Sequence, residues 1–170
     1  MTSRSTTPSA EAAVTPPNQG GELSSCGTPE ETFALGKRLA EQFRSGDLIL
    51  LYGGLGAGKT LFTKGVLDGL GYDVHEVTSP SFALVNLYRA ERFDVYHIDL
   101  WRVGESGDPG GAVGLEDILA ERNAVTIIEW AEHLGHREFQ NRTITIGISG
   151  DGDEARNIAI SISADCGENI

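Results

Sequence analysis

The sequence predicts an α/β fold: a mixed sheet with a parallel centre, antiparallel hairpins at its edges and helices on its faces. Short continuous apolar runs at 48–52 and 125–128 are typical of strands buried on both faces of a sheet. Alternating apolar and polar residues at 83–100 and 143–163 predict hairpins. Strands interleaved with helical segments, then hairpins, indicate one mixed sheet.

The two ends of the chain are expected to lie outside the folded domain. Residues 1–27 are rich in Ser, Thr, Pro and Ala and lack apolar periodicity, which predicts a disordered tail. Residues 165–170 are expected to be frayed. Residues 28–164 then form a single domain, long enough to bury a core without a disulfide or metal staple.

The elements follow from local signals, beginning with a helix whose first turn contains Thr28, Pro29 and Glu31. Thr28 is an N-cap residue, Pro29 suits the first helical position and Glu31 completes a capping box. This helix is expected to stop near residue 46. The apolar run 48–52 is a buried strand, and a glycine-rich turn leads directly from it into a second helix over 58–70.

The second half of the chain predicts further strands and little helix. Residues 83–89 and 93–100 are expected to pair as a hairpin, with Tyr88 on its surface. A glycine-rich loop at 104–111 precedes a short helix near 115–121. A buried strand at 125–128 follows, and segments 143–149 and 157–163 form a closing antiparallel hairpin.

Composition excludes several classes of protein. The formal net charge of −12 argues against stand-alone nucleic-acid binding, because no basic stripe is available to neutralise phosphates. Cys26 and Cys166 stand far apart, outside any Cys-x-x-Cys pattern, which suits a reducing cytosol. No apolar stretch approaches the roughly 18 residues that span a bilayer, so a cytoplasmic protein without membrane contact is expected.

The strongest chemical signal is the segment from Gly53 to Thr60, which matches G-x-x-x-x-G-K-[ST]. Glycines allow successive backbone N–H groups to turn inward around phosphate oxygens. The helix that follows adds the positive end of its dipole. Lys59 is expected to neutralise the β- and γ-phosphates, and the Thr60 hydroxyl to bind Mg²⁺. The motif stands between a buried strand and a helix, as this chemistry requires, and therefore predicts a P-loop NTPase-like fold.

Two acidic residues at strand ends are candidates for the metal and for water activation. Asp99 follows the strand residues 95–98, and Glu129 follows 127–128. A P-loop needs an acidic partner for its metal and a group that positions the attacking water. Both carboxylates are therefore predicted to be functional, and the sequence leaves open which of them binds Mg²⁺ directly.

The same residues resemble a known family. The segments G-G-L-G-A-G-K-T, T-S-P-S-F-A-L, H-I-D-L-W-R, G-L-E-D and I-I-E-W are similar to TsaE, the ATPase component of the bacterial machinery that makes threonylcarbamoyladenosine in tRNA. The likeness runs from about residue 28 to 160. It implies a Mg²⁺-dependent ATPase that binds the TsaB–TsaD complex, with ATP and Mg²⁺ as its ligands and the transfer chemistry belonging to TsaD.

The resemblance also assigns roles to individual residues. It implies that residues 79–82 form a switch-like loop that senses the nucleotide and that Trp130 packs near the nucleotide or the partner surface. His97 and Arg102 belong to the same signature, although His97 on its strand could equally be a hydrogen-bonded structural residue. The expected catalytic residues are Glu129, Asp99 and Lys59. The expected metal ligands are Thr60, Asp99 and Glu129, and the expected nucleotide contacts are Gly53, Gly54, Leu55, Gly56, Ala57, Gly58, Lys59, Thr60, Leu61, Ser81 and Trp130.

The chain departs from the family pattern at a few positions, and other functions stay open. The family commonly has Asp at the place of Gly54, Thr at those of Leu61 and Ser81, and Tyr at that of Trp101. A small-molecule P-loop kinase would share the loop, although no arginine-rich lid is evident. A nucleotide-gated binding module with little turnover is a further alternative. No base-specificity motif such as N-K-x-D separates ATP from GTP.

Overall fold

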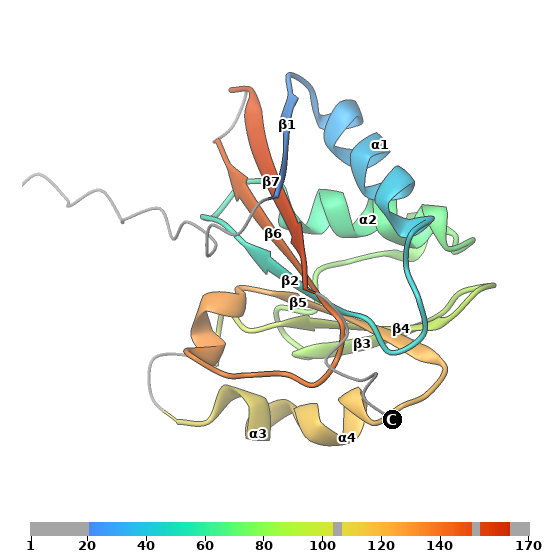
Figure 1. The fold of residues 1–170 in the computed structure, drawn as a ribbon, viewed down its shortest axis with the longest axis vertical. Helices are drawn as coiled ribbons and strands as arrows, with labels where there is room; N and C mark the ends of the chain where they lie inside the picture. Colours follow the sequence, from blue (N-terminus) through green and yellow to red (C-terminus); the bar gives the residue numbers. More distant parts are fainter. Residues whose placement is uncertain (1–20, 104–106, 151–153, 164–170) are drawn as a thin grey trace, which may run out of the picture.

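The computed structural model describes residues 21–103, 107–150 and 154–163. They form a seven-stranded sheet with helices on both faces (Figure 1). In chain order the elements are β1 (Glu22–Cys26), α1 (Pro29–Ala40), β2 (Leu48–Tyr52), α2 (Lys59–Gly69), η1 (Val74–Glu76), β3 (Val85–Arg89), β4 (Asp94–Asp99), α3 (Pro109–Val113), α4 (Leu115–Leu119), β5 (Ala124–Glu129), η2 (Ala131–Leu134), β6 (Thr143–Ser149) and β7 (Arg156–Ile162).

The sheet has the predicted parallel centre and antiparallel edges. Its strand order is β1-β7-β6-β2-β5-β4-β3, in which β6, β2, β5 and β4 are mutually parallel. The pairs β1–β7, β6–β7 and β3–β4 are antiparallel. Every residue of β5 is buried, as the continuous apolar run indicated. The register places Asp99 beside Glu129 at the ends of β4 and β5. The predicted fold class is confirmed.

The expected tail boundary at residue 27 is wrong, because β1 lies inside it. Residues Glu22–Cys26 pair with β7 along their whole length, from Glu22 opposite Ile160 to Cys26 opposite Arg156. Cys26 is only 4% exposed. The segment carries no apolar alternation of its own, and hydrogen bonds to the distant strand β7 make it a strand. Residues 1–20 and 164–170, which include the expected frayed end, lie outside the described residues.

Helix α1 begins with the cap that the sequence predicts. The Thr28 hydroxyl accepts a hydrogen bond from the Glu31 amide at 3.2 Å, and the Glu31 carboxylate accepts one from the Gly27 amide at 2.6 Å. Helices α1 and α2 pack on one face of the sheet, whereas α3 and α4 cover the other (Figure 1). The contact between α1 and α2 is close: a Cβ at Gly65 would collide with the Phe33 carbonyl. A side chain at that position would separate the two helices.

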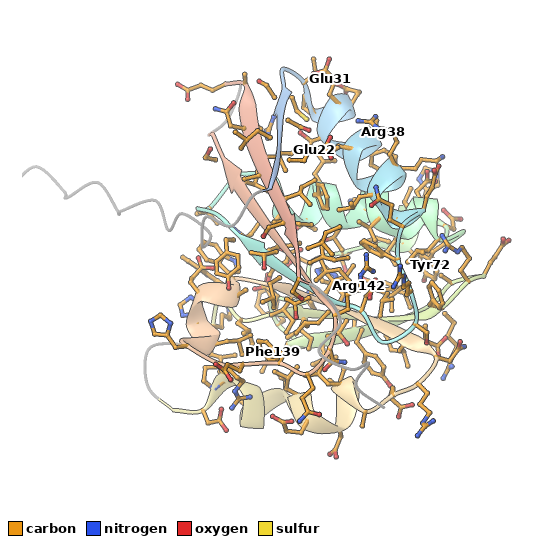
Figure 2. The ribbon with its side chains drawn as sticks, viewed as in Figure 1. Glu22, Glu31, Arg38, Tyr72, Phe139 and Arg142 are labelled. Atoms are coloured by element: carbon orange, nitrogen blue, oxygen red, sulfur yellow. The ribbon has the colours of Figure 1, made fainter. Side chains whose placement is uncertain are left out.

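Apolar side chains fill both spaces between sheet and helices (Figure 2). The larger cluster joins α1 and α2 to the sheet and includes Phe62 and Ile127, both fully buried. The smaller one includes Leu48, Ile98 and Leu115 and lies beneath α3, α4 and η2. Burial of a large aliphatic or aromatic side chain is worth about 1.5–3 kcal/mol. The two clusters therefore hold β2, β4 and β5 rigidly in the middle layer.

Two local expectations need correction. Tyr88 was expected on the hairpin surface, yet it is 6% exposed, because its ring packs edge-on against Tyr72 at 5.0 Å. The glycine-rich segment contains helix α3 as well as loop, since Pro109 occupies its first turn. Residues 104–106 of that segment lie outside the described residues. Among the described residues, none of the helices has the length and apolar character needed to cross a membrane.

Candidate functional site: a phosphate loop facing two buried carboxylates

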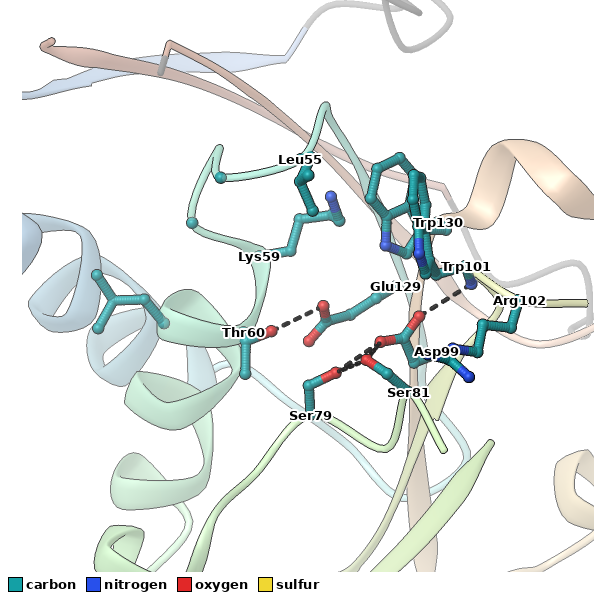
Figure 3. Close-up of a pocket in the computed structure, with 13 residues that line it drawn as sticks. Leu55, Lys59, Thr60, Ser79, Ser81, Asp99, Trp101, Arg102, Glu129 and Trp130 are labelled. Atoms are coloured by element: carbon teal, nitrogen blue, oxygen red, sulfur yellow. Dashed lines mark hydrogen bonds between the residues drawn. The ribbon is translucent and has the colours of Figure 1, made fainter. Parts of the chain in front are cut away.

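A cavity of about 510 Å³ opens where the ends of β4 and β5 meet the start of α2 (Figure 3). It is lined by Leu55, Gly56, Gly58, Lys59, Thr60, Leu61, Ser79, Ser81, Asp99, Trp101, Arg102, Glu129 and Trp130. Parallel strands bring their carboxyl ends to one edge of the sheet, where open α/β folds bind their ligands. Residues separated by more than 70 positions in the sequence therefore share one cavity.

The phosphate loop forms the rim of this cavity. It leaves β2 after Tyr52 and enters α2 at Lys59, so the predicted strand–turn–helix context is present. Gly58 has φ +107°, a conformation that side chains with a Cβ resist, and Arg156 Nε would lie 3.0 Å from a Cβ built there. The amides of the first turn of α2 have no preceding turn to bond, which leaves them for an anion.

Lys59 lies almost fully buried between the loop and an aromatic ring. Its ammonium donates hydrogen bonds to the Gly53 and Gly54 carbonyls at 2.6 and 2.8 Å and lies 3.5 Å from the centre of a Trp130 ring. Burial lowers the pKa of Lys59, whereas the nearby charges of Glu129, Glu132 and Asp99 act in the opposite direction. The cation is thus poorly hydrated, and an anionic ligand in the cavity would offset the free-energy cost of burying its charge.

Glu129 lies at the centre of a buried hydrogen-bond network. Its Oε2 accepts from the Thr60 hydroxyl at 3.0 Å (Figure 3). Its Oε1 is bonded to His97 Nε2 at 2.8 Å and accepts from the Thr63 hydroxyl at 3.4 Å. The side chain is only 3% exposed, so these bonds replace the water that a carboxylate would otherwise hold. The network joins the start of α2 to β4 and β5.

Asp99 holds the loop that follows η1. The hydroxyls of Ser79 and Ser81 both donate to its Oδ2, at 2.6 and 2.7 Å. Its Oδ1 accepts from the Trp101 amide at 2.9 Å, so the residue after β4 is fixed as well. Leu84, at the end of the same loop, has φ +65°, which is unusual for a leucine. Both oxygens of Asp99 are therefore engaged, and its main contacts are with the loop.

Two tryptophans and an arginine form the outer wall. The rings of Trp101 and Trp130 lie 4.4 Å apart, and Trp130 has φ +61° directly after β5. Arg102 stacks on the ring of Phe82 at 4.3 Å, and Phe82 is 85% exposed. The wall therefore combines aromatic surface with a cation that lines the cavity.

The structure brings most of the predicted site residues together. Both carboxylates line the cavity, as do Lys59, Thr60, Leu61, Ser81 and Trp130. Three of the predicted nucleotide contacts do not line it. Gly53 and Gly54 accept the hydrogen bonds of Lys59 instead, and Ala57 is buried with its carbonyl accepting from Arg156 Nε at 3.0 Å.

Sequence reasoning did not single out Thr63 and Arg156. Thr63 lies one helical turn after Lys59, a spacing that could have placed its hydroxyl near Glu129. Arg156 comes from β7, and no local pattern connects it with the phosphate loop. It supports that loop only because β7 lies next to β6 in the sheet.

One family of known proteins matches most of this chain. The family model described as "Threonylcarbamoyl adenosine biosynthesis protein TsaE" matches residues 26–158. The chain belongs to the TsaE family. The tRNA threonylcarbamoyladenosine biosynthesis protein TsaE of Bacillus subtilis (strain 168) is 35% identical over 133 residues, which cover 78% of this chain and 80% of the relative. The protein of the same name from Mycobacterium tuberculosis (strain ATCC 25618 / H37Rv) is 34% identical over 140 residues, or 78% of this chain and 80% of that one.

A solved structure shares the fold. The crystal structure of Bacillus subtilis YdiB aligns with a TM-score of 0.61 and 29% sequence identity, over 86% of this chain and 90% of that chain. The TsaE match covers both the phosphate loop and the Asp99–Glu129 pair. The cavity therefore lies within the part of the chain that the family shares.

Proposed function

We propose that this chain is a Mg²⁺-dependent, cytoplasmic ATPase that binds the TsaB–TsaD complex and supports threonylcarbamoyladenosine modification of tRNA. One observation carries the proposal: Lys59, Thr60 and Glu129 meet at a cavity whose rim is a phosphate loop. The relatives' names place them in the biosynthesis of this modification. The overall charge of −12 suits a subunit that contacts protein rather than tRNA.

The residues present fit a nucleoside triphosphate. Backbone amides at the start of α2 and the ammonium of Lys59 are the donors that a phosphate chain requires. Binding would replace the present contacts of Lys59 with the Gly53 and Gly54 carbonyls, which lie in the same loop. The buried cation then gains a full negative charge as its partner in place of carbonyl dipoles. The tryptophan pair supplies aromatic surface at the cavity wall.

The residues also fit Mg²⁺. This ion takes one or two protein oxygens and completes its shell with water and substrate phosphates. Thr60 Oγ1 and Glu129 Oε2, now bonded to each other at 3.0 Å, are such a pair. Among the described residues, His, Cys, Asp and Glu form no group of three that could hold a metal without a phosphate. When bound, Mg²⁺ neutralises charge on the β- and γ-phosphates.

Asp99 is assigned to the reaction through the loop that it holds. Ser79 and Ser81 are fixed by Oδ2 at the cavity wall, so their hydroxyls can respond to a γ-phosphate and expose the carboxylate. A freed Asp99 oxygen can accept a hydrogen bond from the attacking water and orient it. In this assignment Thr60 and Glu129 hold the metal. Asp99 orients the attacking water once the loop that carries Ser79 and Ser81 has moved.

The same loop supports a second candidate, a nucleotide-gated binding module with little turnover. The contacts of Asp99 with two hydroxyls form a latch that nucleotide could open, and the exposed ring of Phe82 belongs to the same loop. In that case ATP changes the affinity for TsaB–TsaD, and hydrolysis stays at background when the partners are present.

Phosphate release from ATP tests the proposal. The purified chain is assayed alone and with TsaB and TsaD, with Mg²⁺ or with EDTA, as wild type and as Glu129→Ala. Turnover that needs Mg²⁺, rises with the partners and is lost in the variant supports the ATPase. ATP-dependent association without turnover favours the binding module. Transfer of phosphate to a small acceptor, with no response to the partners, contradicts both and indicates a kinase.

A further inference from the structure

His97 does not line the cavity, but it hydrogen-bonds to Glu129, which does. It lies on β4, opposite Ile127 of β5 and two positions before Asp99, and its side chain is completely buried. Its Nε2 lies 2.8 Å from Glu129 Oε1. Neither the family match nor the relatives' names assign it a role.

The chemistry of the pair fixes the direction of this hydrogen bond. An ionised carboxylate only accepts, so His97 Nε2 carries the proton and donates to Glu129. His97 Nδ1 is buried and has no hydrogen-bond partner among the described residues. Among the described residues, the bond to Glu129 is thus the one side-chain hydrogen bond of this buried ring.

The bond determines how Glu129 presents its two oxygens. His97 and Thr63 engage Oε1, on the inner side, which leaves Oε2 turned toward Thr60 and the cavity. Without the His97 donor, the carboxylate could rotate and satisfy Oε1 from the cavity side. Groups that hydrogen-bond to a metal-binding carboxylate commonly set its orientation in this way.

We infer that His97 is a positioning residue that fixes the Glu129 carboxylate for Mg²⁺, acting through Glu129 and without contact with the nucleotide. This inference rests on the proposed function, because it concerns the metal of that site. Loss of a group in this outer position typically weakens metal affinity about 10–100-fold. Binding of nucleotide without metal depends on Lys59 and the loop amides and should be spared.

Tryptophan fluorescence offers a readout that does not depend on turnover. The chain has two tryptophans, and both line the cavity. ATP affinity is measured from their signal twice, with Mg²⁺ and with EDTA. His97→Met fills the same space with an apolar side chain of similar volume and removes the hydrogen-bond donor. His97→Gln restores an N–H near the position of Nε2. Val95→Ala, on the same strand and equally buried, is the matched control for lost packing.

The expected pattern is specific. His97→Met weakens ATP binding about 10-fold or more in Mg²⁺ and by less than about twofold in EDTA. His97→Gln recovers most of the Mg²⁺-dependent affinity, and Val95→Ala lowers the melting temperature without changing the ratio of the two affinities. Equal losses in both buffers for His97→Met, or no recovery in His97→Gln, would overturn the inference alone. A wild type that binds no ATP in either buffer would overturn the proposed function and the inference with it.

Discussion

The parallel centre of the sheet and its antiparallel edge bury different kinds of side chain. Strands β4 and β5 bury His97, Asp99, Thr126 and Glu129. In the described residues of β7 and β1, Arg156 is the one buried charged or polar residue, and the rest of the buried set is apolar or Cys26. Buried polar groups cost free energy unless they are bonded. Strands β4 and β5 therefore bear this cost at the candidate site, whereas β7 and β1 contribute mainly stability.

Lys59→Ala should have the largest effect on the candidate site. In the proposed function Lys59 faces bound phosphate, so removal of this buried cation should weaken ATP binding by about 1,000-fold, within the 2–5 kcal/mol expected for a buried charged partner. The melting temperature should not fall much, because burial lowers the pKa of Lys59 and so disfavours its charged form in the fold. Calorimetric titration of ATP and a thermal melt measure both. Lys64→Ala, on the same helix but outside the cavity lining, is the control and should bind normally.

Asp99→Asn should separate chemistry from binding. The amide is isosteric but is a poor acceptor for a water proton, so turnover should fall about 100-fold while ATP affinity changes by less than about fivefold. Asp94→Asn, at the far end of β4 and paired with Arg89, should retain wild-type turnover. Steady-state kinetics with TsaB and TsaD present measure both variants. An equal loss of affinity and turnover would remove the separate role of Asp99.

Two N-terminal deletions test how much the edge strand β1 contributes to stability. Removal of residues 1–20 leaves β1 intact, whereas removal of 1–27 takes away its whole pairing with β7 and the buried Cys26. Cross-strand pairs contribute about 0.2–1 kcal/mol each, so the longer deletion should cost about 1–5 kcal/mol of unfolding free energy. Urea unfolding measures the difference. Similar curves for the two proteins would show that β1 adds nothing and would restore the boundary predicted from the sequence.

Ile158→Val is the mildest test of the same region. The side chain is completely buried on β7, and removal of one methylene there should cost about 0.5–1.5 kcal/mol of stability. Turnover per folded molecule should be unchanged, since β7 does not line the cavity. Unfolding and phosphate release are measured on the same preparation. A loss of turnover with intact stability would mean that the edge takes part in the chemistry.

The sequence predicts the parts of the site whose chemistry is local. The phosphate loop can be recognised in the sequence because its glycines, Lys59 and Thr60 must lie close together in the chain. A buried strand and a helix must also flank them. Asp99 and Glu129 are readable because each ends an apolar strand, and parallel strands end at the same edge.

Other features depend on distant partners and carry little local signal. Strand β1 has a polar sequence, E-L-S-S-C, and becomes a strand by pairing with β7. Tyr88 is buried by Tyr72, which follows α2. Arg156 reaches the Ala57 carbonyl from 99 positions away. Their positions depend on the assembled sheet, which no short window of sequence describes.

ATP turnover by Glu129→Gln with Mg²⁺, TsaB and TsaD, expressed per folded molecule, shows whether the buried carboxylate serves catalysis. Gln keeps the shape: its oxygen can accept from His97 while its amide nitrogen donates to the Thr60 hydroxyl, so the melting temperature should stay within about 2 °C of wild type, less than 1 kcal/mol for a chain of this size. Turnover should fall about 100-fold, because the proposed function needs the charge of this carboxylate for Mg²⁺. Wild-type turnover in a stable Glu129→Gln protein would contradict the claim that this buried carboxylate is kept for catalysis.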